Sequence, residues 1–385
     1  MATTFGSSRL GVSVVSRTAP PSRGIPTGTD TWFVAAVTDV GPTDKAIEVR
    51  DLAQFEDEFG ARTAGNIELW DALDVFFREG GKRAYIARGD GAAAADITDA
   101  ADLFVSGLGP GQVSAIGFPL AADADVAEAL WPHAQANNRF AIADVPDATD
   151  ASALEAYGAL LQDLDTNDGS GAVFGPHVMV PPPAGVLGAS PRKIPASPVI
   201  AALCARVDET GNPNQAAAGR WLPLQYVSEL TYDVGMDERA NLLDAGVNLM
   251  GEIYGVLENY GFQTPVEQNS ENPFWQANCS RMRMALVAQA LAIGENYMFR
   301  PIDGQGARAN AFKTDLEAML LTYFSVGALY GREPEDAFLV QVGETVNTDD
   351  TIAQGRLRAV ASVVLSLHAK AIEIELVSVP VGGQV

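Results

Sequence analysis

Three histidines, His133, His177 and His368, are the side chains of this sequence best suited to proton transfer or metal binding near neutral pH. None of them stands in an HxxxH or HExxH spacing, and the sequence has no CxxC pair, so the usual short zinc motifs are missing. The nucleophile motif GxSxG is also missing, and the GSG at residues 169–171 lies in a polar loop. We therefore predict neither a metal site nor catalytic residues.

Two glycine clusters, at residues 106–112 and 303–310, are of the kind that can bring backbone amides close to a phosphate. The first contains Pro110, which has no amide hydrogen, and it precedes an expected strand instead of a helix. The second follows a helical pattern and has no strand before it. Since the phosphate-loop motif GxxxxGK[ST] does not occur either, we predict no nucleotide site and no cofactor.

Among the many carboxylates, Asp144 stands out because it follows a buried strand pattern, RFAIADVP at residues 139–146. Active sites of open α/β sheets lie at the carboxyl ends of strands, so Asp144 is a candidate catalytic group. A helix cap or a turn ahead of Pro146 explains the same residue without chemistry. An α/β enzyme with an unrecognised site therefore stays open as an alternative.

The composition is that of a globular chain with 385 residues, 47% of them hydrophobic and 19% charged, enough for two or three domains. Its 49 acidic and 25 basic residues leave a net charge of -24, which opposes binding to DNA or RNA. The two cysteines, Cys204 and Cys279, predict buried thiols. No window reaches the roughly 18 to 20 apolar residues that cross a bilayer, so we expect no membrane insertion and folding in the cytoplasm.

Strand and helix patterns alternate through the first half of the chain. The expected strands cover residues 31–38, 84–89, 113–119, 139–146 and 172–183, and the expected helices of the regular alternation cover residues 97–106, 123–137 and 150–164. This order is typical of βαβ units. The fold class that we predict is α/β, with a mainly parallel sheet core covered by helices.

The second half predicts a different, α+β domain towards the C-terminus. Residues 278–298 and 308–330 have the pattern of two long amphipathic helices. Two strands, expected at residues 337–344 and 355–367, then pair across a polar loop.

Both ends of the chain carry alternating β-type runs, at residues 10–15 and 371–379, with no obvious partner strand. An unpaired strand leaves backbone N–H and C=O groups that another chain can accept, so we expect extended N- and C-terminal β-arms that pair with other copies. The residues expected to take part in this strand exchange are Leu10, Val12, Val14, Val15, Ile372, Ile374, Leu376 and Val377 on the arms, with Phe338, Val340, Val342, Leu357 and Val360 on the accepting pair.

Taken together, stretches along nearly the whole chain resemble the contractile tail sheath proteins, which form the outer contracting tube of phage tails, pyocin-like particles and related injection systems. The stretches that carry the resemblance are GVSVVSRTAPPSRGIPTGTDTWFVAAVTDVGP, DLAQFEDEFG, ALDVFFREGGKRAYIARG, RFAIADVP, PVIAALCARVDETGNPNQAAAGRW, LLDAGVNLM and FSVGALYGREPEDAFLVQVGETVNTDDTIAQGRLRAVASVVL. The sequence departs from the family after the Gly-Val-Asn turn, where it reads GEIYGVLENYG.

The resemblance implies a division of the chain into arms and two domains. Residues 1–28 and 371–385 would be the N- and C-terminal linker arms. Residues 29–90 and 260–370 would form the inner, tube-facing α+β domain, and residues 91–259 an α/β domain of subtilisin-like topology without protease chemistry. The arms would bend at hinges in residues 16–28 and 366–371.

The resemblance also implies a structural role without enzymatic activity. Copies of the chain would form hexameric rings, stacked helically and linked by strand exchange, that contract from a metastable extended state and drive an inner tube through a target envelope. Further partners would be the inner tube protein, the baseplate and the tail-terminator or cap proteins. The particle would assemble in a bacterial or archaeal cytoplasm and be part of a virion tail or an injection particle.

The contact with the inner tube is expected in the C-terminal domain. The residues that the resemblance suggests for it are Lys313, Asp315, Glu317, Arg332, Glu335 and Asp336. A non-contractile shell or surface-layer protein is the second alternative that the sequence leaves open.

Overall fold

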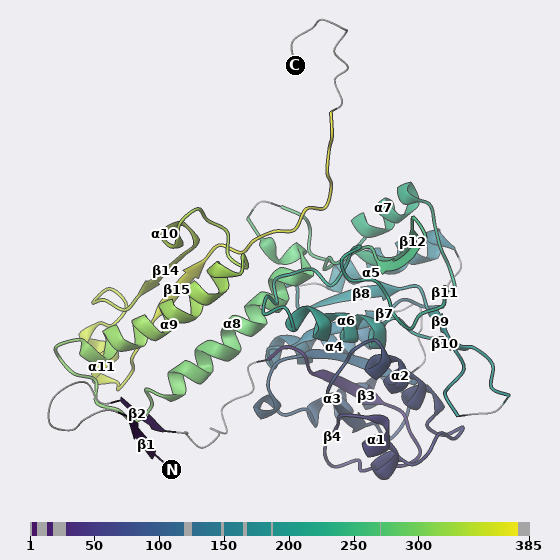
Figure 1. Cartoon of the computed structure of the whole chain (residues 1–385), viewed down its shortest axis with the longest axis horizontal. Coiled ribbons are helices and arrows are strands. Elements are labelled where there is room, and N and C mark those ends of the chain that lie inside the picture. Colours follow the sequence, from purple (N-terminus) through teal and green to yellow (C-terminus); the bar gives the residue numbers. More distant parts are fainter. Residues whose placement is uncertain are drawn as a thin grey trace, which may run out of the picture.

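The structure, a computed structural model, describes residues 2–5, 14–17, 28–118, 125–147, 150–164, 168–185, 188–269 and 271–375. Two bodies lie side by side and are connected by the long helix α8 (Ala277–Glu295), as Figure 1 shows. The larger one, the α/β body, runs from residue 28 to the start of α8. The smaller one, the distal domain, consists of α8 and the elements that follow it.

An eight-stranded sheet forms the centre of the α/β body, in the order β13-β12-β8-β7-β6-β3-β5-β4. Its strands are β3 (Trp32–Ala36), β4 (Ile47–Val49), β5 (Ala84–Arg88), β6 (Gln112–Ile116), β7 (Phe140–Asp144), β8 (Gly171–Gly175), β12 (Val247–Ile253) and β13 (Val256–Asn259). The six inner strands are parallel, and only the outer strands β4 and β13 run antiparallel to their neighbours. The predicted mainly parallel sheet is confirmed.

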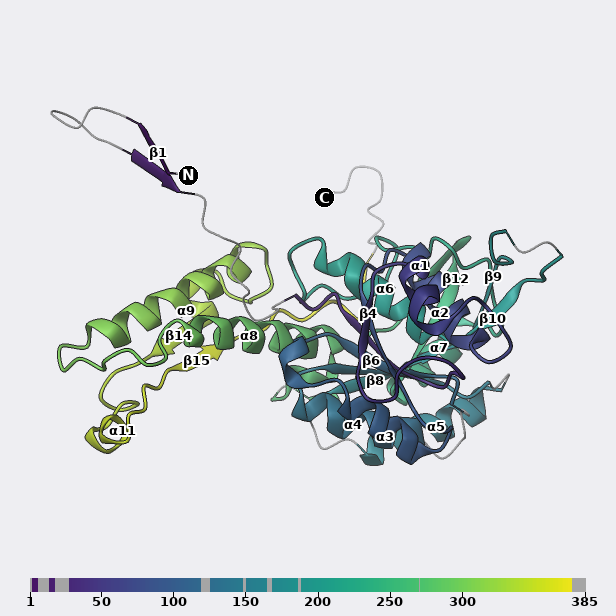
Figure 2. The same ribbon diagram turned by 90° about the horizontal axis from the view of Figure 1, so that it is seen from below.

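Helices cover both faces of this sheet, as Figure 2 shows. One face carries α1 (Leu52–Phe59), α2 (Ile67–Arg78) and α6 (Ser197–Asp208), and the other carries α3 (Ala94–Asp102), α4 (Asp125–Ala136), α5 (Ala151–Leu164) and α7 (Met236–Asp244). Successive residues of β3 serve the two faces, since side chains alternate along a strand. The Trp32 ring lies 4.9 Å from that of Phe76 on α2, and the Phe33 ring lies 5.3 Å from that of Phe104 beyond α3.

Helix α2 illustrates how local sequence sets these elements. Its buried residues Leu69, Leu73 and Phe76 recur at helical spacing and face the core. The helix ends at a glycine pair because Gly80 has a φ of 108° and a Cβ on Gly81 would lie 2.3 Å from the Phe76 ring. The chain can then turn directly into β5.

The α/β body also contains a small three-stranded sheet with the order β10-β9-β11, built from β9 (Val178–Val180), β10 (Arg192–Ile194) and β11 (Glu229–Leu230), and the turns η1 (Ser106–Leu108) and η2 (Pro273–Trp275). The sequence predicts one long strand over residues 172–183, and this prediction is wrong. The run is divided into β8 in the large sheet and β9 in the small one, on either side of Pro176, which has no N–H to continue a ladder.

The expected division of the chain into domains does not agree with the strands that form the central sheet. Residues 29–90 were expected to belong with residues 260–370, yet β3 and β5 lie next to β6 inside the same sheet as the strands of residues 91–259. The physical reason is that β3 lies inside the sheet, where the parallel neighbours β5 and β6 complete the backbone hydrogen bonds of its two edges. The α/β body therefore comprises residues 28–276, and the separate α+β domain begins at α8.

The distal domain packs two long helices against a two-stranded sheet. Its elements are α8, α9 (Ala307–Ser325), α10 (Pro334–Ala337), β14 (Phe338–Gln341), α11 (Asp349–Ala353) and β15 (Val360–Val363). Met282, Leu316, Leu320, Tyr323 and Val340 form its core. The two predicted helices and the strand pair are confirmed, with the strands shorter than expected and a short helix, α11, in the polar loop.

The N-terminal residues that the structure describes form a hairpin, in which β1 (Ala2–Phe5) pairs antiparallel with β2 (Val14–Arg17). Val14 and Val15 thus have a strand partner in their own chain, and the expectation that this arm lacks one is wrong for them. The reason is proximity, because β1 is the nearest strand along the chain that can supply the missing hydrogen bonds. Leu10 and Val12 lie outside the described residues.

Candidate functional site

The expected acceptor for strand exchange is present as the antiparallel pair β14 and β15, with Phe338 opposite Val363 and Gln341 opposite Val360. No other named strand in the described ranges joins this sheet, so each strand has an outer edge whose backbone groups point away from the pair. Val340 is buried against α9, whereas Leu339, Val360 and Val364 are exposed. The pair has the chemistry of an edge that another strand can extend.

A buried asparagine shapes the loop that links the two strands. Asn347 donates from Nδ2 to the carbonyl oxygens of Val342 and Arg358, each at 2.8 Å, and accepts from the Arg358 N–H at 2.7 Å. Asn347 therefore connects the segment after β14 to the segment before β15, although the two segments form no continuous ladder of backbone hydrogen bonds. The predicted residues Val342 and Leu357 lie in these two segments. Leu357 lies before β15 and not in it.

Side-chain amides at the junction of the α/β body and α8 hold residues 366–370, which follow the strand pair. Gln276 donates to the carbonyl oxygen of His368 at 3.0 Å and accepts from its N–H at 2.9 Å, as a neighbouring strand would. Asn278 contacts the His368 Nδ1 at 2.8 Å and donates to Asn214, which in turn donates to the Ser366 carbonyl oxygen at 2.7 Å. We call Asn214, Gln276, Asn278 and His368 the amide clamp.

The amide clamp changes the expected position of the C-terminal hinge. A hinge was expected at residues 366–371, but residues 366–370 are held by the clamp and by the Lys370 Nζ, which lies 2.5 Å from an Asp244 carboxylate oxygen. Burial lowers the pKa of His368 to about 4, so its ring is neutral at neutral pH. The chain leaves the body only after Lys370, at residues 371–375, which pair with no described strand; Ile372 and Ile374 there are 80% and 85% exposed. Leu376 and Val377 lie outside the described residues.

We predict that Gln276→Met frees this segment while the fold stays intact. The change removes two hydrogen bonds, each contributing about 1 kcal/mol, so trypsin should cleave after Lys370 at least tenfold faster than in the unchanged chain. Mass spectrometry of timed digests measures the rate. Gln268→Met is the matched control, since Gln268 reaches only the Lys370 side chain, at 3.5 Å. Equal rates in both variants would show that Gln276 does not hold the segment.

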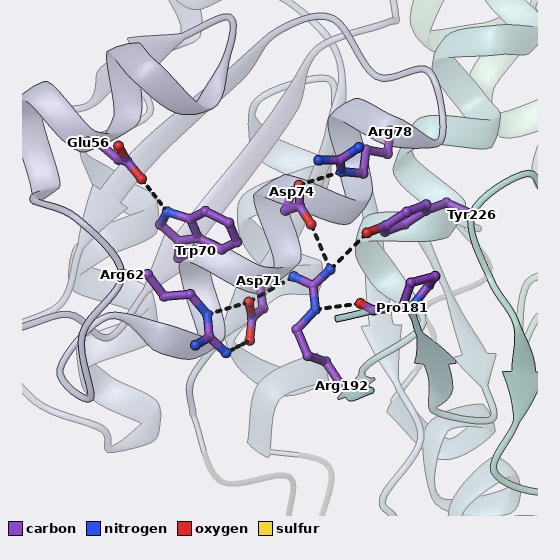
Figure 3. A network of polar contacts seen from close by, with 9 residues as sticks. All are labelled: Glu56, Arg62, Trp70, Asp71, Asp74, Arg78, Pro181, Arg192 and Tyr226. Carbon is purple, nitrogen blue, oxygen red and sulfur yellow. Dashed lines mark hydrogen bonds and ion pairs between the residues drawn. The ribbon is translucent and has the colours of Figure 1, made fainter. Parts of the chain in front are cut away.

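A network of buried charges anchors α2 to the small sheet, as Figure 3 shows. The Arg192 guanidinium contacts the carboxylates of Asp71 at 2.9 Å and Asp74 at 2.7 Å, the Tyr226 hydroxyl and the Pro181 carbonyl oxygen. Arg62 forms a two-pronged pair with Asp71, and Arg78 pairs with Asp74. Each of the two buried carboxylates is thus shared by two guanidiniums, which makes this a structural network with no free group for chemistry.

A second buried ion pair attaches α8 to the α/β body. The fully buried Arg281 of α8 lies 2.8 Å from the carboxylate of Asp208 on α6, and Thr29 donates to the other oxygen of Asp208 at 2.6 Å. Because separating such a pair would leave a buried charge alone, the first turns of α8 are tied firmly to α6.

The carboxyl ends of the central strands, where an enzyme of this fold class would carry its site, border a cavity of about 520 Å³. Asp144 lines it, but both carboxylate oxygens accept hydrogen bonds at 2.6 Å from Ser197, one from its N–H and one from its hydroxyl. Asp144 therefore anchors the start of α6, as the structural alternative suggested. His177 and Lys193 also line the cavity, and Lys193 pairs with Asp147.

The pH dependence of stability should reveal this buried carboxyl group. Burial raises the pKa of Asp144 to about 7, against 3.8 for an exposed carboxyl, although hydrogen bonds from Ser197 act the other way. The folded chain then binds the proton more tightly than the unfolded chain, so the stability it contributes is full below pH 4 and is lost as the pH rises to 7. Urea unfolding at pH 5 and pH 8 should show a larger loss in the unchanged chain than in Asp144→Asn. Equal losses would mean that Asp144 ionises freely in the fold.

The other chemical candidates from the sequence also have structural roles. His133 contacts Arg139, and burial lowers its pKa to about 4. In the second glycine cluster, the carboxylate of Asp303 accepts from the N–H groups of Gln305, Ala307 and Arg308, so the amides that a phosphate would need are already bonded. Within the described residues no group of three or more His, Cys, Asp or Glu side chains is placed to hold a metal ion.

The residues expected to contact an inner tube fall into two separate groups. Lys313, Asp315 and Glu317 lie around the middle of α9, where Lys313 pairs with Glu317 at 3.5 Å and Asp315 accepts from the Tyr297 hydroxyl. Arg332 lies beyond the C-terminal end of α9, and Glu335 and Asp336 lie in the short helix α10. The ten helical steps from Asp315 to the helix end at Ser325 rise about 15 Å. No hydrogen bond or ion pair joins the two groups within the part of the chain that the structure describes.

Solved structures, and not sequences, are where this chain finds similar proteins. No family model matches the chain, and no curated protein matches it in sequence. Among solved structures, a chain of the anti-feeding prophage baseplate matches with a TM-score of 0.71 and 19% identity, over 97% of this chain and 99% of that one. A contracted sheath complex of the extracellular contractile injection system PVC matches with a TM-score of 0.71 and 17% identity, over 98% and 99%.

A more distant match is a sheath tail protein of Listeria innocua, with a TM-score of 0.54 and 10% identity over 86% of this chain and 90% of that one. Within the described ranges of the present chain, no helix has the length and apolarity that crossing a membrane requires. The matches extend over both bodies and leave little of either protein uncovered. The chain therefore has the fold of the contractile sheath proteins.

Proposed function

We propose that this protein is a structural subunit of a contractile sheath and that its copies are linked by strand exchange. The observation that carries the proposal is the combination, in one chain, of an open two-stranded sheet, β14 and β15, with an exposed apolar arm that pairs with no described strand. The arm of one copy adds as a strand to the sheet of the next copy. The unpaired backbone groups of both copies then form hydrogen bonds, and their exposed apolar side chains become buried. The fold shared with sheath proteins supports this function.

In this proposal the amide clamp transmits force from the C-terminal arm to the rest of the subunit. Load on the C-terminal arm passes through His368 to Gln276 and Asn278, at the root of α8, and from there through Arg281 into the α/β body. Each subunit then moves as a unit, while the chain bends outside residues 366–370. On this basis hexameric rings, stacked helically, contract from a metastable extended state into a better-packed one and drive an inner tube through a target envelope.

The proposed partners are further copies of the chain, an inner tube protein, a baseplate and a terminator or cap protein. The distal domain faces the tube and offers the exposed polar residues of α9 or of the 331–336 turn as a contact. A grip through exposed charges detaches readily, since such ion pairs contribute only about 0 to 1 kcal/mol each. We place assembly in a bacterial or archaeal cytoplasm and propose no enzymatic activity, in keeping with the buried and fully bonded state of Asp144.

Negative-stain microscopy of the purified full-length chain tests the proposal. Helical tubes or six-fold rings are expected at high protein concentration. A protein that stays monomeric at all concentrations, alone and with a tube-forming partner, would contradict the proposal. A single-layered sheet or closed shell would instead favour the non-contractile alternative.

A further inference from the structure

The loop between α8 and α9 presents two apolar side chains to the solvent. Met298 is 54% exposed, and Phe299 is fully exposed. The backbone of Phe299 has a φ of 59°, a left-handed conformation that bulky residues rarely adopt. Strain of this kind is typical of positions at which a side chain is presented to a binding partner. We call Met298 and Phe299 the knob.

The knob is held in place by contacts on both of its flanks. On one side, the Tyr297 ring lies 4.9 Å from that of Phe312, and the Tyr297 hydroxyl donates to the Asp315 carboxylate at 2.6 Å. On the other side, the Asp303 carboxylate accepts from the N–H of Arg308 at 2.8 Å, at the start of α9. An apolar group that is already held in position loses little conformational entropy on binding, which favours a specific contact.

The same chain has a cavity that suits an apolar group. It measures about 480 Å³ and lies where α8 meets the α/β body. Its apolar wall includes Pro110, Ala134, Met284, Val287 and Leu291. Val287 and Leu291 are 40% and 57% exposed, so this wall is open to solvent. Pockets of this size take up whole small molecules, so an aromatic side chain can enter it.

The charged side chains that line the cavity already have partners within the chain. Arg283 pairs with the Asp168 carboxylate at 2.6 Å. Arg139 donates to the carbonyl oxygens of Phe104 and Val105. The apolar wall therefore determines which occupant the cavity suits.

The knob does not reach the cavity of its own chain. It follows the C-terminal end of α8, at the end of the distal domain that lies away from the α/β body (Figure 1 and Figure 2). The cavity borders residues 280–291 of the same helix, and the helix rises about 16 Å from Met284 to its end at Glu295. Because the knob is held in place, a knob that fills this cavity must come from another molecule.

Charge favours a second copy of this chain as that molecule. Arg300, next to the knob, is exposed and takes part in none of the ion pairs found among the described residues. Glu295, one turn beyond Leu291 on α8, is likewise exposed and outside those ion pairs. Since every other copy has a net charge of -24, the positive charge of Arg300 is attracted to it.

We propose that the knob of one copy enters this cavity of a second copy. Phe299 packs against Met284 and Val287 of the second copy, and Arg300 pairs with Glu295 at the edge of the apolar wall. Because the knob and the cavity are different surfaces, each copy contacts one neighbour through its knob and another through its cavity, in a head-to-tail contact. The contact uses neither β14 and β15 nor the C-terminal arm, so it goes beyond the proposed function.

Disulfide formation between two full-length chains tests the contact, at protein concentrations below those that give tubes. One chain carries Met298→Cys, and the other carries Leu291→Cys or, in a parallel experiment, Val287→Cys. We expect at least one of these mixtures to form the mixed dimer at least tenfold faster than Met298→Cys with Leu321→Cys. Leu321 is the matched control because it is apolar and 49% exposed but lies on α9, away from the cavity.

Further variants test the role of the aromatic side chain. Adding Phe299→Ser to the Met298→Cys chain should slow the cross-link at least tenfold, because the group that becomes buried in the cavity is removed. Phe299→Leu should retain most of the rate. A single chain with both Met298→Cys and Leu291→Cys should give a ladder of dimers, trimers and longer products. The two positions lie about 10 Å apart along the chain direction of α8, too far for a disulfide within one copy.

Three results would overturn the proposal: a rate no higher than that of the Leu321→Cys control with both acceptors, a rate that Phe299→Ser leaves unchanged, or a doubly substituted chain whose product stops at the dimer. Failure of the proposed function would have a different result, since cross-linked ladders would then form without tubes at any concentration. Tubes that form while the cross-link is no faster than the control would contradict the knob contact alone.

Discussion

Replacing Arg192 with methionine is expected to lower the free energy of unfolding by about 3 to 5 kcal/mol. The substitution removes the guanidinium that two buried carboxylates, Asp71 and Asp74, share, and each of them keeps only its second arginine. The cost comes from leaving buried negative charge undercompensated, since methionine fills much of the same space. Urea unfolding followed by circular dichroism measures it.

The matched control for this prediction is Arg50→Met, which breaks an exposed pair with Glu48. That change should cost less than about 1 kcal/mol, because solvent screens exposed pairs. Similar costs for the two variants would contradict the description of the Arg192 network as a buried anchor between α2 and the small sheet.

Ending the chain after Lys370 is expected to leave a folded subunit that assembles only at a much higher protein concentration. Residues 371–375 are exposed and pair with no described strand, so the unfolding temperature should change by little. In the proposed strand exchange these five residues form several hydrogen bonds to a neighbouring copy, each contributing about 1 kcal/mol, and the truncation removes them. The concentration needed for tubes or rings should therefore rise more than a hundredfold, as light scattering and microscopy can measure.

Side-chain substitutions distinguish the loss of a specific contact made by the arm from the effect of shortening the chain. The double variant Ile372→Ser with Ile374→Ser should impair assembly strongly, because two apolar side chains lose their burial against the neighbour. Glu373→Ser, between them, is the matched control and should assemble nearly as the unchanged chain does. Assembly of the truncated chain at the usual concentration would show that the arm is not the link.

The parts of the fold that the sequence predicts are those with continuous local patterns. Strands such as β6 and β7 are mostly apolar, and every residue in them is buried, which is the pattern of a parallel sheet. The helices α8 and α9 and the pair β14 and β15 are likewise predicted, within a few residues. The domain division fails because nothing in the local pattern of β3 says that it pairs with both β5 and β6.

The candidate site is predicted only in part, for the same reason. The exposed isoleucines of the arm and the strand pair follow from alternation along the chain. The amide clamp does not, since Asn214, Gln276 and His368 are far apart in sequence and common in polar loops. The partner of Val14 and Val15 was also missed, because Ala2–Phe5 is too short and too mixed in character to be recognised as a strand.

The most direct test of the account is a cross-link between two singly substituted chains. One chain carries Ile374→Cys, and the other carries Leu339→Cys on β14 or, in a parallel experiment, Val360→Cys on β15. The native Cys204 and Cys279 are buried, with thiol pKa values raised to about 11 and about 12 by burial, so they should not react.

Under mild oxidation, we expect the Ile374→Cys chain to form a disulfide-linked dimer with the Leu339→Cys chain, the Val360→Cys chain or both. The amount of this dimer should increase with the fraction of protein that has assembled. The central claim is that the C-terminal arm of one copy pairs with the two-stranded sheet of another. Absence of this product from assembled particles with both acceptor positions, or a bond formed only within a single chain carrying both cysteines, would contradict that claim.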